Sequence, residues 1–249
     1  MITPIKKASY INPIQGITLA SAVYDRLKAD ILQGRFTADQ KLKIEELSSF
    51  YETGASPLRE ALNRLSAEGL VSRSDQRGFN VAPLRWEELE TLTETRCFIE
   101  GKALEESIAH RTEEWEHKLV LLIHKLSKKP RSSESDQHSA NPEWELLHKE
   151  FHKTLLENAP SRWIKEFSET LGTESYRYRQ VAASKNFGER DHHAEHVGIF
   201  EAAISGDVNL AKQLLFEHYR KTSALTGRGA KSLKLIKYQQ SQFLNQDQG

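Results

Sequence analysis

Four of the ten histidines in this chain are spaced so that their side chains can meet. His148 and His152 lie four residues apart, which places both imidazoles on one face of a helix. His196 and His218 lie in two later segments that have helical periodicity, close to apolar residues. Three helices converging on one interior would bring these imidazoles together, and imidazole nitrogens bind zinc, nickel, copper or iron. From spacing alone, a buried polar core is the competing interpretation.

The other histidines stand singly on polar stretches or side by side, and we expect them at the surface. They are His110, His117, His124, His138, His192 and His193. One function that a histidine metal site could serve is that of a metal-dependent hydrolase, in which the metal activates water and a general base lies beside it. Glu145, one helical turn before His148, is the obvious candidate for that base. The hydrolase does not account for residues 19–83, so we do not expect an enzyme.

The composition is that of a globular protein, which could supply the packed helices that such a site requires. Of the 249 residues 38% are hydrophobic and 28% charged, and the 35 basic and 35 acidic side chains cancel. This balance excludes a polybasic protein and an acidic disordered chain. Cys97 is the single cysteine, which excludes an intramolecular disulfide framework. No run of 18 apolar residues suggests a membrane span, and no signal peptide is apparent. We therefore expect a cytoplasmic protein with no membrane partner.

The fold class predicted from periodicity is mostly α, with one short β-hairpin. Helices are expected from Leu19 to Gly34, over 43–52, and from Ser56-Pro57 to Gly69, with Ser56 as N-cap. Strands are expected over 70–73 and 79–81, around a turn that ends at Gly78. Further helices are expected over about 87–111, 113–128, 142–158, 161–184, 190–205 and 207–225, with a loop over 128–141.

These elements indicate two domains between two tails. Residues 1–18 form a flexible N-terminal arm, 19–83 a winged helix-turn-helix DNA-binding domain, and 87–227 an all-α helical bundle. Residues 228–249 form a basic polar tail that we expect to be frayed. It carries Arg228, Lys231, Lys234 and Lys237 against Asp247.

Three short helices followed by a hairpin is the order of a winged helix-turn-helix, whose third helix enters the major groove. Leu58, Leu62 and Leu65 would form the inner face of that helix, and the hairpin would contact phosphate or the minor groove. An ordinary three-helix bundle with surface arginines is the alternative on periodicity alone. The candidate DNA-binding residues are Lys43, Ser56, Arg59, Asn63, Arg64, Arg73, Arg77 and Gly78.

Residues 19–83 closely resemble the DNA-binding domain of the GntR family of transcription regulators. The pieces ILQGRF, KL…EEL, SPLREALNRLSAEGLV and RGFNV appear in order. The resemblance implies a homodimer that binds operator DNA at an inverted repeat. Gly54 and Ala55 stand where the family often has Ser/Thr-Arg, so this chain lacks a common operator contact.

Residues 89–223 look like the FCD effector domain of the FadR subfamily of GntR regulators. ETRCFIEGKAL, HKEFHKTLLENA and EHVGIFEAAISGDVNLAKQLLFEHYR carry the resemblance. It implies a divalent transition metal held by His148, His152, His196 and His218. Position 148 is His instead of the family's common Asp, which removes a negative charge and favours zinc or nickel over manganese.

The resemblance also implies a small carboxylate effector in the helical domain. Arg96 can form a helical ion pair with Glu100, but in the family an arginine at this place often points into the effector cavity. Arg177 and Arg179 lie in a YRYR run, and we choose Arg177 as the second effector-binding residue. Similarity of GASPLREAL and HKEFH to regulators of glutarate and 4-aminobutyrate catabolism points to a dicarboxylate such as glutarate. The expected function is a ligand-responsive repressor, because the metal site argues against an effector-independent architectural DNA binder.

Overall fold

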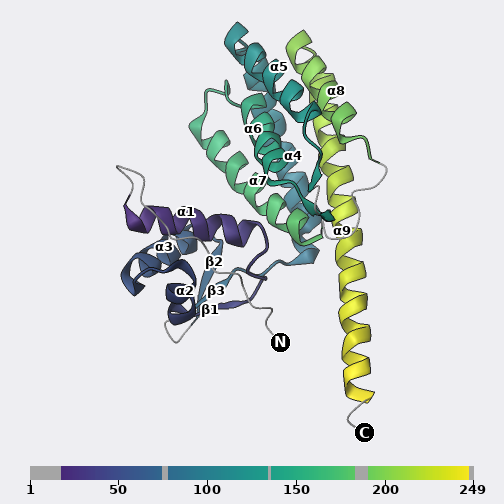
Figure 1. Ribbon diagram of the computed structural model, residues 1–249. Helices are drawn as coiled ribbons and strands as arrows, with labels where there is room; N and C mark the ends of the chain where they lie inside the picture. The colour runs from purple at the N-terminus through teal and green to yellow at the C-terminus, as the bar shows by residue number, and fades with distance from the viewer. Residues whose placement is uncertain (1–17, 75–77, 134–135, 183–189, 247–249) are drawn as a thin grey trace. The chain divides into compact units, whose positions relative to one another are not determined.

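The computed structural model describes residues 18–74, 78–133, 136–182 and 190–246. The chain divides into two compact units, Met1–Leu84 and Arg85–Gly249, and each is described by itself. Helices dominate both units (Figure 1). Within the described ranges, no helix is long and apolar enough to cross a membrane. The predicted N-terminal arm lies outside these ranges except for Thr18, whose hydroxyl accepts a hydrogen bond from the backbone N–H of Ser21 and so caps the first helix.

The N-terminal unit is a winged helix-turn-helix, as the sequence predicts. Its helices are α1 (Leu19–Leu32), α2 (Ile44–Tyr51) and α3 (Ala55–Ala67), followed by strands β2 (Val71–Ser74) and β3 (Gly78–Val81). The two strands pair antiparallel, with Val71 opposite Val81. A short strand that the sequence did not indicate, β1 (Lys41–Leu42), pairs with β3 and gives the sheet order β1-β3-β2. Two residues are too few to show an alternating pattern.

The core of this unit confirms the predicted inner face of α3. Leu58, Leu62 and Leu65 are completely buried. Their four- and three-residue spacing places them on one stripe of the helix, which packs against α1. The N-terminal end of α3 differs from the prediction: Gly54, not Ser56, is the N-cap, and Ser56 is an exposed residue of the first turn. Pro57 does not mark the helix start, because any position of the first turn tolerates the missing N–H.

The C-terminal unit is a bundle of helices that opens with a short 3-10 turn, η1 (Trp86–Glu88). The helices lie within a few residues of their predicted bounds at every end but the last. They are α4 (Leu89–Ala109), α5 (Glu113–Ser127), α6 (Pro142–Leu155), α7 (Arg162–Ala182), α8 (His192–Ser205) and α9 (Val208–Gln246). Figure 1 shows α9 running beside α8 and α4, which it contacts along with α7.

Two segments of this unit differ from the prediction. The expected loop over 128–141 contains a small hairpin, β4 (Ser132–Ser133) and β5 (Asp136–Ala140). The expected frayed tail is helical, because α9 continues to Gln246. Gly227 and Gly229 do not end α9, since it packs closely on α7 there. A Cβ atom on Gly229 would lie 3.0 Å from the carbonyl oxygen of Ala182.

Large apolar side chains fill the centre of the bundle. Trp115, Phe151 and Leu155 are buried there, and Ile199 and Leu215 join them from α8 and α9. The indole N–H of Trp115 donates to the backbone carbonyl of Thr154, which satisfies a buried polar group and fixes α5 on α6. This packing places the inner faces of α6, α8 and α9 around a common interior.

Candidate functional site

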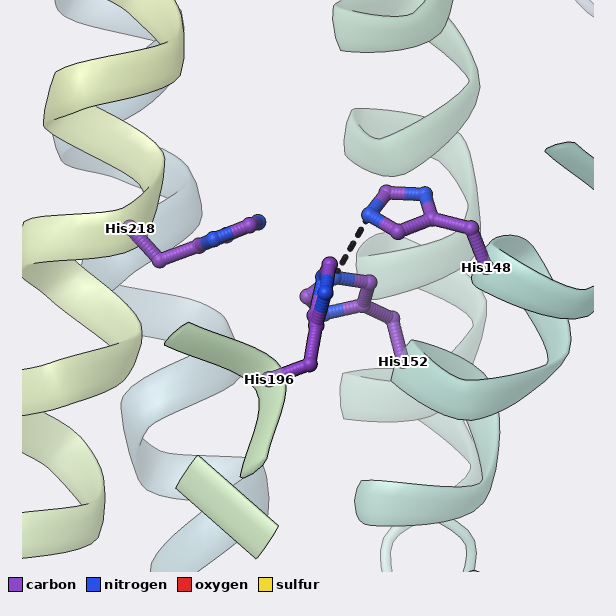
Figure 2. Close-up of side chains that lie close together, drawn as sticks. All are labelled: His148, His152, His196 and His218. Atoms are coloured by element: carbon purple, nitrogen blue, oxygen red, sulfur yellow. Dashed lines mark hydrogen bonds between the residues drawn. The ribbon is translucent and has the colours of Figure 1, made fainter. Parts of the chain in front are cut away.

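Four imidazoles meet in the interior of the C-terminal unit. His148 and His152 come from α6, His196 from α8 and His218 from α9 (Figure 2). One nitrogen from each ring can be chosen so that all four atoms lie within 4.8 Å of one another. Nε2 of His148 and Nε2 of His152 are 3.1 Å apart. The i, i+4 spacing and the three-helix convergence expected from the sequence are therefore both present.

The Tyr219 hydroxyl orients the ring of His152. This hydroxyl donates its single proton to Glu100, so its oxygen can only accept from Nδ1 of His152, 3.2 Å away. Nδ1 of His152 then carries the ring proton, and the lone pair of Nε2 points toward the other histidines. Arg96 supports the same chain of contacts, because its Nε lies 2.6 Å from Glu100 and its guanidinium stacks on the Tyr219 ring at 3.9 Å.

His218 and His196 are held in the same way. Nδ1 of His218 lies 2.8 Å from a carboxylate oxygen of Glu195, which can only accept, so Nδ1 carries the proton. A backbone group of His192 hydrogen-bonds the His196 ring and raises its pKa, as an accepting carbonyl does. Nε2 of His196 is buried with no partner among the described residues. A buried lone pair without a donor is costly, and a metal ion would satisfy it.

Burial keeps these imidazoles neutral. It lowers the pKa of His148, His152 and His218 well below the ordinary value, and the neighbouring histidines add to the effect. The pKa of His196 falls to about 3, again chiefly through burial. Neutral imidazole is the form that binds a metal. A tetrahedral ion with bonds of 2.0–2.1 Å needs nitrogens about 3.3 Å apart, so modest ring rotations would close the present spacing.

Three buried ion pairs surround the histidines. Arg96 pairs with Glu100, Arg179 with Glu145 at 2.5 Å, and Arg190 with Glu195. Each member of these pairs has a side chain less than one-fifth exposed. Because the charges of these pairs cancel, a divalent ion bound to four neutral imidazoles would keep its full positive charge. An anion is the natural completing ligand for such an ion.

Arg177 and Arg179 have different partners in the structure. Arg177 is buried and bonds Glu174 on its own helix, at 2.9 Å. Arg179 instead pairs with Glu145 of α6 at 2.5 Å, one turn before His148. The two arginines are separated by about 200° around the helix, at about 100° per residue. Both side chains are largely buried, and Arg179 is the one that pairs with a residue of α6, the helix of His148 and His152.

Sequence reasoning placed His192 at the surface, and this was wrong. His192 is half-buried, and burial together with Arg131 lowers its pKa to about 2. Nε2 of His192 contacts the Arg131 guanidinium, which also lies over the Trp144 ring. His110, His117, His124 and His193 are exposed, as predicted, and the side chain of His138 lies outside the description. Arg131 had no distinguishing signal in the sequence, since it lies in a polar stretch that predicts a loop.

The second candidate site is the outer face of α3 in the N-terminal unit. Arg59 is exposed in the first turns of the helix and makes no ion pair or hydrogen bond within the described ranges. Asn63 is exposed and accepts a hydrogen bond of 2.9 Å from Arg73 of β2, which links the recognition helix to the wing. Arg64 is differently placed: it stacks on Tyr24 at 3.8 Å and donates to Ser21. Arg64 therefore holds α3 against α1.

The remaining candidates surround this face. Lys43 pairs with Glu46 at 2.6 Å just before α2, and Ser56 is exposed. A side chain on Gly78 would press on Ser74, since an added Cβ would lie 2.6 Å from Oγ. Gly78 thus permits the close approach of the two wing strands. Arg77 lies outside the described residues.

Comparisons with known proteins cover both units. Residues 19–81 match the family described as "Bacterial regulatory proteins, gntR family", and residues 91–221 match the FCD domain. BphR of Paraburkholderia xenovorans (strain LB400), an uncharacterized HTH-type transcriptional regulator, is 34% identical over 207 residues, 83% of this chain and 84% of BphR. The HTH-type transcriptional repressor GlaR of Escherichia coli (strain K12) is 32% identical over 199 residues, 78% of this chain and 90% of GlaR.

Solved structures show the same fold. E. coli McbR/YncC aligns with a TM-score of 0.71 at 19% identity, over 85% of this chain and 98% of that one. A putative GntR transcriptional regulator from Rhodococcus sp. RHA1 aligns with a TM-score of 0.65 at 18% identity, over 83% and 96%. At these identities, the likeness concerns the arrangement of helices.

Proposed function

The chain belongs to the gntR family of bacterial regulatory proteins and is a transcription regulator with an FCD effector domain, and we propose that a small carboxylate bound at a metal controls its operator binding. His148, His152, His196 and His218 are the proposed metal ligands. The observation that carries the proposal is the convergence of four neutral imidazole nitrogens within 4.8 Å in the interior of the FCD unit.

Zinc or nickel fits the proposed site best. Four nitrogen ligands suit these ions, whereas Mg²⁺ and Ca²⁺ prefer oxygen. The partners that fix the three ring protons are those of a metal-binding histidine: a tyrosine hydroxyl, a carboxylate and a backbone group. Nε2 of His196 is buried without a hydrogen-bond partner among the described residues, and a bound ion would satisfy it.

A carboxylate is the proposed effector because it would complete the charge of the metal. Arg96 stacks on Tyr219, which contacts His152, and Arg179 pairs with Glu145 one turn before His148, so we propose that either guanidinium positions the anion. A dicarboxylate such as glutarate is the specific proposal, based on sequence resemblance. In place of Arg177, we now assign Arg179 as the second arginine of the effector site.

The proposed regulator is a repressor that acts as a homodimer on an inverted repeat. GlaR is named a repressor, which supports this sign of regulation. Protein two-fold symmetry is mirrored in the operator when each wing reads one half-site. Effector binding must favour the DNA-incompetent arrangement, and a coupling of about 1–3 kcal/mol would change operator affinity about 5–150-fold.

The alternative of a metal-dependent hydrolase is not favoured by the geometry. Its candidate base, Glu145, is buried, and its carboxylate is already engaged in an ion pair with Arg179 at 2.5 Å. We therefore propose that the metal serves in ligand binding alone.

Metal analysis and a thermal-shift screen test the proposal together. The purified parent should contain one divalent ion per chain, and small carboxylates should raise the melting temperature only of the metal-loaded protein. His152→Ala should lose both the ion and the carboxylate response but keep operator binding. His124→Ala, which removes an exposed histidine, is the matched control. A parent that binds no metal, or a His152→Ala protein with a normal carboxylate response, would contradict the proposal.

A further inference from the structure

The four histidines are not held alike. Nδ1 of His152 and Nδ1 of His218 are fixed by partners outside the cluster, Tyr219 and Glu195. The His196 ring is hydrogen-bonded by a backbone group of His192, and its Nε2 has no partner among the described residues, which leaves Nδ1 as the bonded nitrogen. With its proton on Nδ1, each of these rings can present only Nε2 to a metal. The same three histidines are buried. They form a pre-oriented set that needs only modest ring rotations to bind an ion.

His148 has no such partner. Within the described ranges, its Nδ1 makes no hydrogen bond, and the one nitrogen within hydrogen-bonding distance of its Nε2 is Nε2 of His152. Its ring instead stacks on Trp144, with centroids 4.6 Å apart and planes inclined by 15°. His148 is also half-buried, unlike the other three. An aromatic stack holds the ring in its plane but leaves the choice of protonated nitrogen open.

We propose that His148 is a displaceable ligand: it occupies the fourth position of the metal when no effector is bound and gives this position to the carboxylate. This inference rests on the metal site proposed above. In the exchange, the bond between the metal and Nε2 of His148 breaks and a bond to a carboxylate oxygen forms. The imidazole leaves as a neutral group with its own lone pair, so no proton or electron is transferred.

The surroundings of His148 suit an arriving anion. Arg179 pairs with Glu145, which lies one turn before His148 on α6. Arg131 lies over the Trp144 ring, on which His148 stacks. A carboxylate that approaches the metal from this side meets two guanidinium groups, and the released imidazole can stay against Trp144.

The exchange would make the effector-free and effector-bound states of the regulator differ in how the metal is bonded to α6. Without effector, the metal ties α6 at two points, His148 and His152. With effector, it ties α6 only at His152. A ligand shifts a conformational equilibrium only through a free-energy difference between states, and the lost tether on α6 supplies one.

Metal affinity of the four single His→Ala variants tests the inference. Each variant is loaded with zinc and titrated with a chelator, and melting of the chelator-treated proteins checks that all are folded. His148→Ala should keep one zinc per chain with an affinity within about tenfold of the parent, whereas each of the other three should lose about 100-fold or more. His148→Gln should behave like His148→Ala. If His148→Ala loses zinc as fully as His196→Ala, the inference is wrong, whereas a parent without metal would overturn the proposed function itself.

Cobalt(II) absorption gives an independent readout. Without carboxylate, the parent and His148→Ala should have different visible spectra, because one nitrogen ligand is replaced by water. In saturating glutarate the two spectra should become the same, since His148 no longer binds the ion in either protein. Spectra that respond to glutarate but remain different would show that His148 stays bound and would refute the exchange.

Discussion

The hydroxyl oxygen of Tyr219 lies 3.2 Å from Nδ1 of His152, and the same hydroxyl gives its proton to Glu100. The tyrosine thereby acts as the acceptor that fixes the ring proton of His152 away from the other histidines. Arg96 secures this arrangement from the far side of Glu100. Arg96, which the sequence alone would place in a surface ion pair, therefore helps to orient the proposed metal ligand His152 through Glu100 and Tyr219.

Tyr219→Phe should weaken metal binding by about 10–100-fold, the usual effect of losing a partner that orients a ligand. The ring of His152 would lose its acceptor but remain in place, so the protein should still fold. Competition with a chelator measures the affinity. Tyr178→Phe removes a different interior hydroxyl, which donates to the backbone of Arg85, and should leave metal affinity unchanged. Equal affinities for Tyr219→Phe and the parent would mean that the tyrosine does not orient His152.

The stability of the metal-free protein should depend on pH through the buried histidines. Burial lowers the pKa of His152, His196 and His218 in the folded state, so below pH 6.5 the unfolded chain binds more protons. Their contribution is complete above pH 6.5 and is lost as the pH falls toward the folded pKa, about 3 for His196. Below pH 6.5, each of these histidines should lower the free energy of unfolding by about 1.4 kcal/mol per pH unit.

Thermal unfolding between pH 7.5 and 5 measures this slope before carboxylates titrate. His196→Gln should flatten it, and His117→Gln, at an exposed position, should not. A parent protein whose melting temperature is constant over this range would show that the histidines are accessible to protons in the folded state.

Arg59→Ala should lower operator affinity by about 1–3 kcal/mol if Arg59 makes a bidentate base contact. The arginine is exposed on α3 and has no partner in the described part of the protein, so its removal should not destabilise the fold. Arg77→Ala should instead weaken binding to all sequences and flatten the salt dependence. Arg162→Ala, at an exposed position of the other unit, is the control for both. If Arg59→Ala binds the operator with the parent's affinity, Arg59 is not part of the surface that recognises the operator.

A homodimer should protect two half-sites of an inverted repeat whose centres lie about one helical turn of DNA, or a multiple of it, apart. Footprinting shows the protected sequence, and the mass of the free protein shows its oligomeric state. A monomer that protects a single asymmetric site would exclude the proposed symmetry.

Sequence periodicity predicted the helices and the wing hairpin, whereas the winged helix-turn-helix and the four-histidine site also needed the resemblance to the GntR and FCD domains. The i, i+4 spacing of His148 and His152 fixes a shared face whatever the tertiary structure. The choice between Arg177 and Arg179 could not be made, because both lie on one polar helix and both are largely buried, so only their partners in the packed bundle distinguish them. The partners of the histidines were also hidden: Glu100 and Tyr219 are 119 positions apart in the chain. Ser56 was misassigned because Pro57 can occupy any position of a first helical turn.

Operator binding by the metal-loaded parent, with and without glutarate, tests the central claim most directly. Fluorescence anisotropy of a labelled operator gives both affinities, and the same titration is repeated on chelator-stripped protein and on His152→Ala. Glutarate should weaken the affinity of the metal-loaded parent by about 5–150-fold and leave the other two unchanged. An equal response in the stripped protein, or no response in any of them, would contradict a metal-bound carboxylate as the signal.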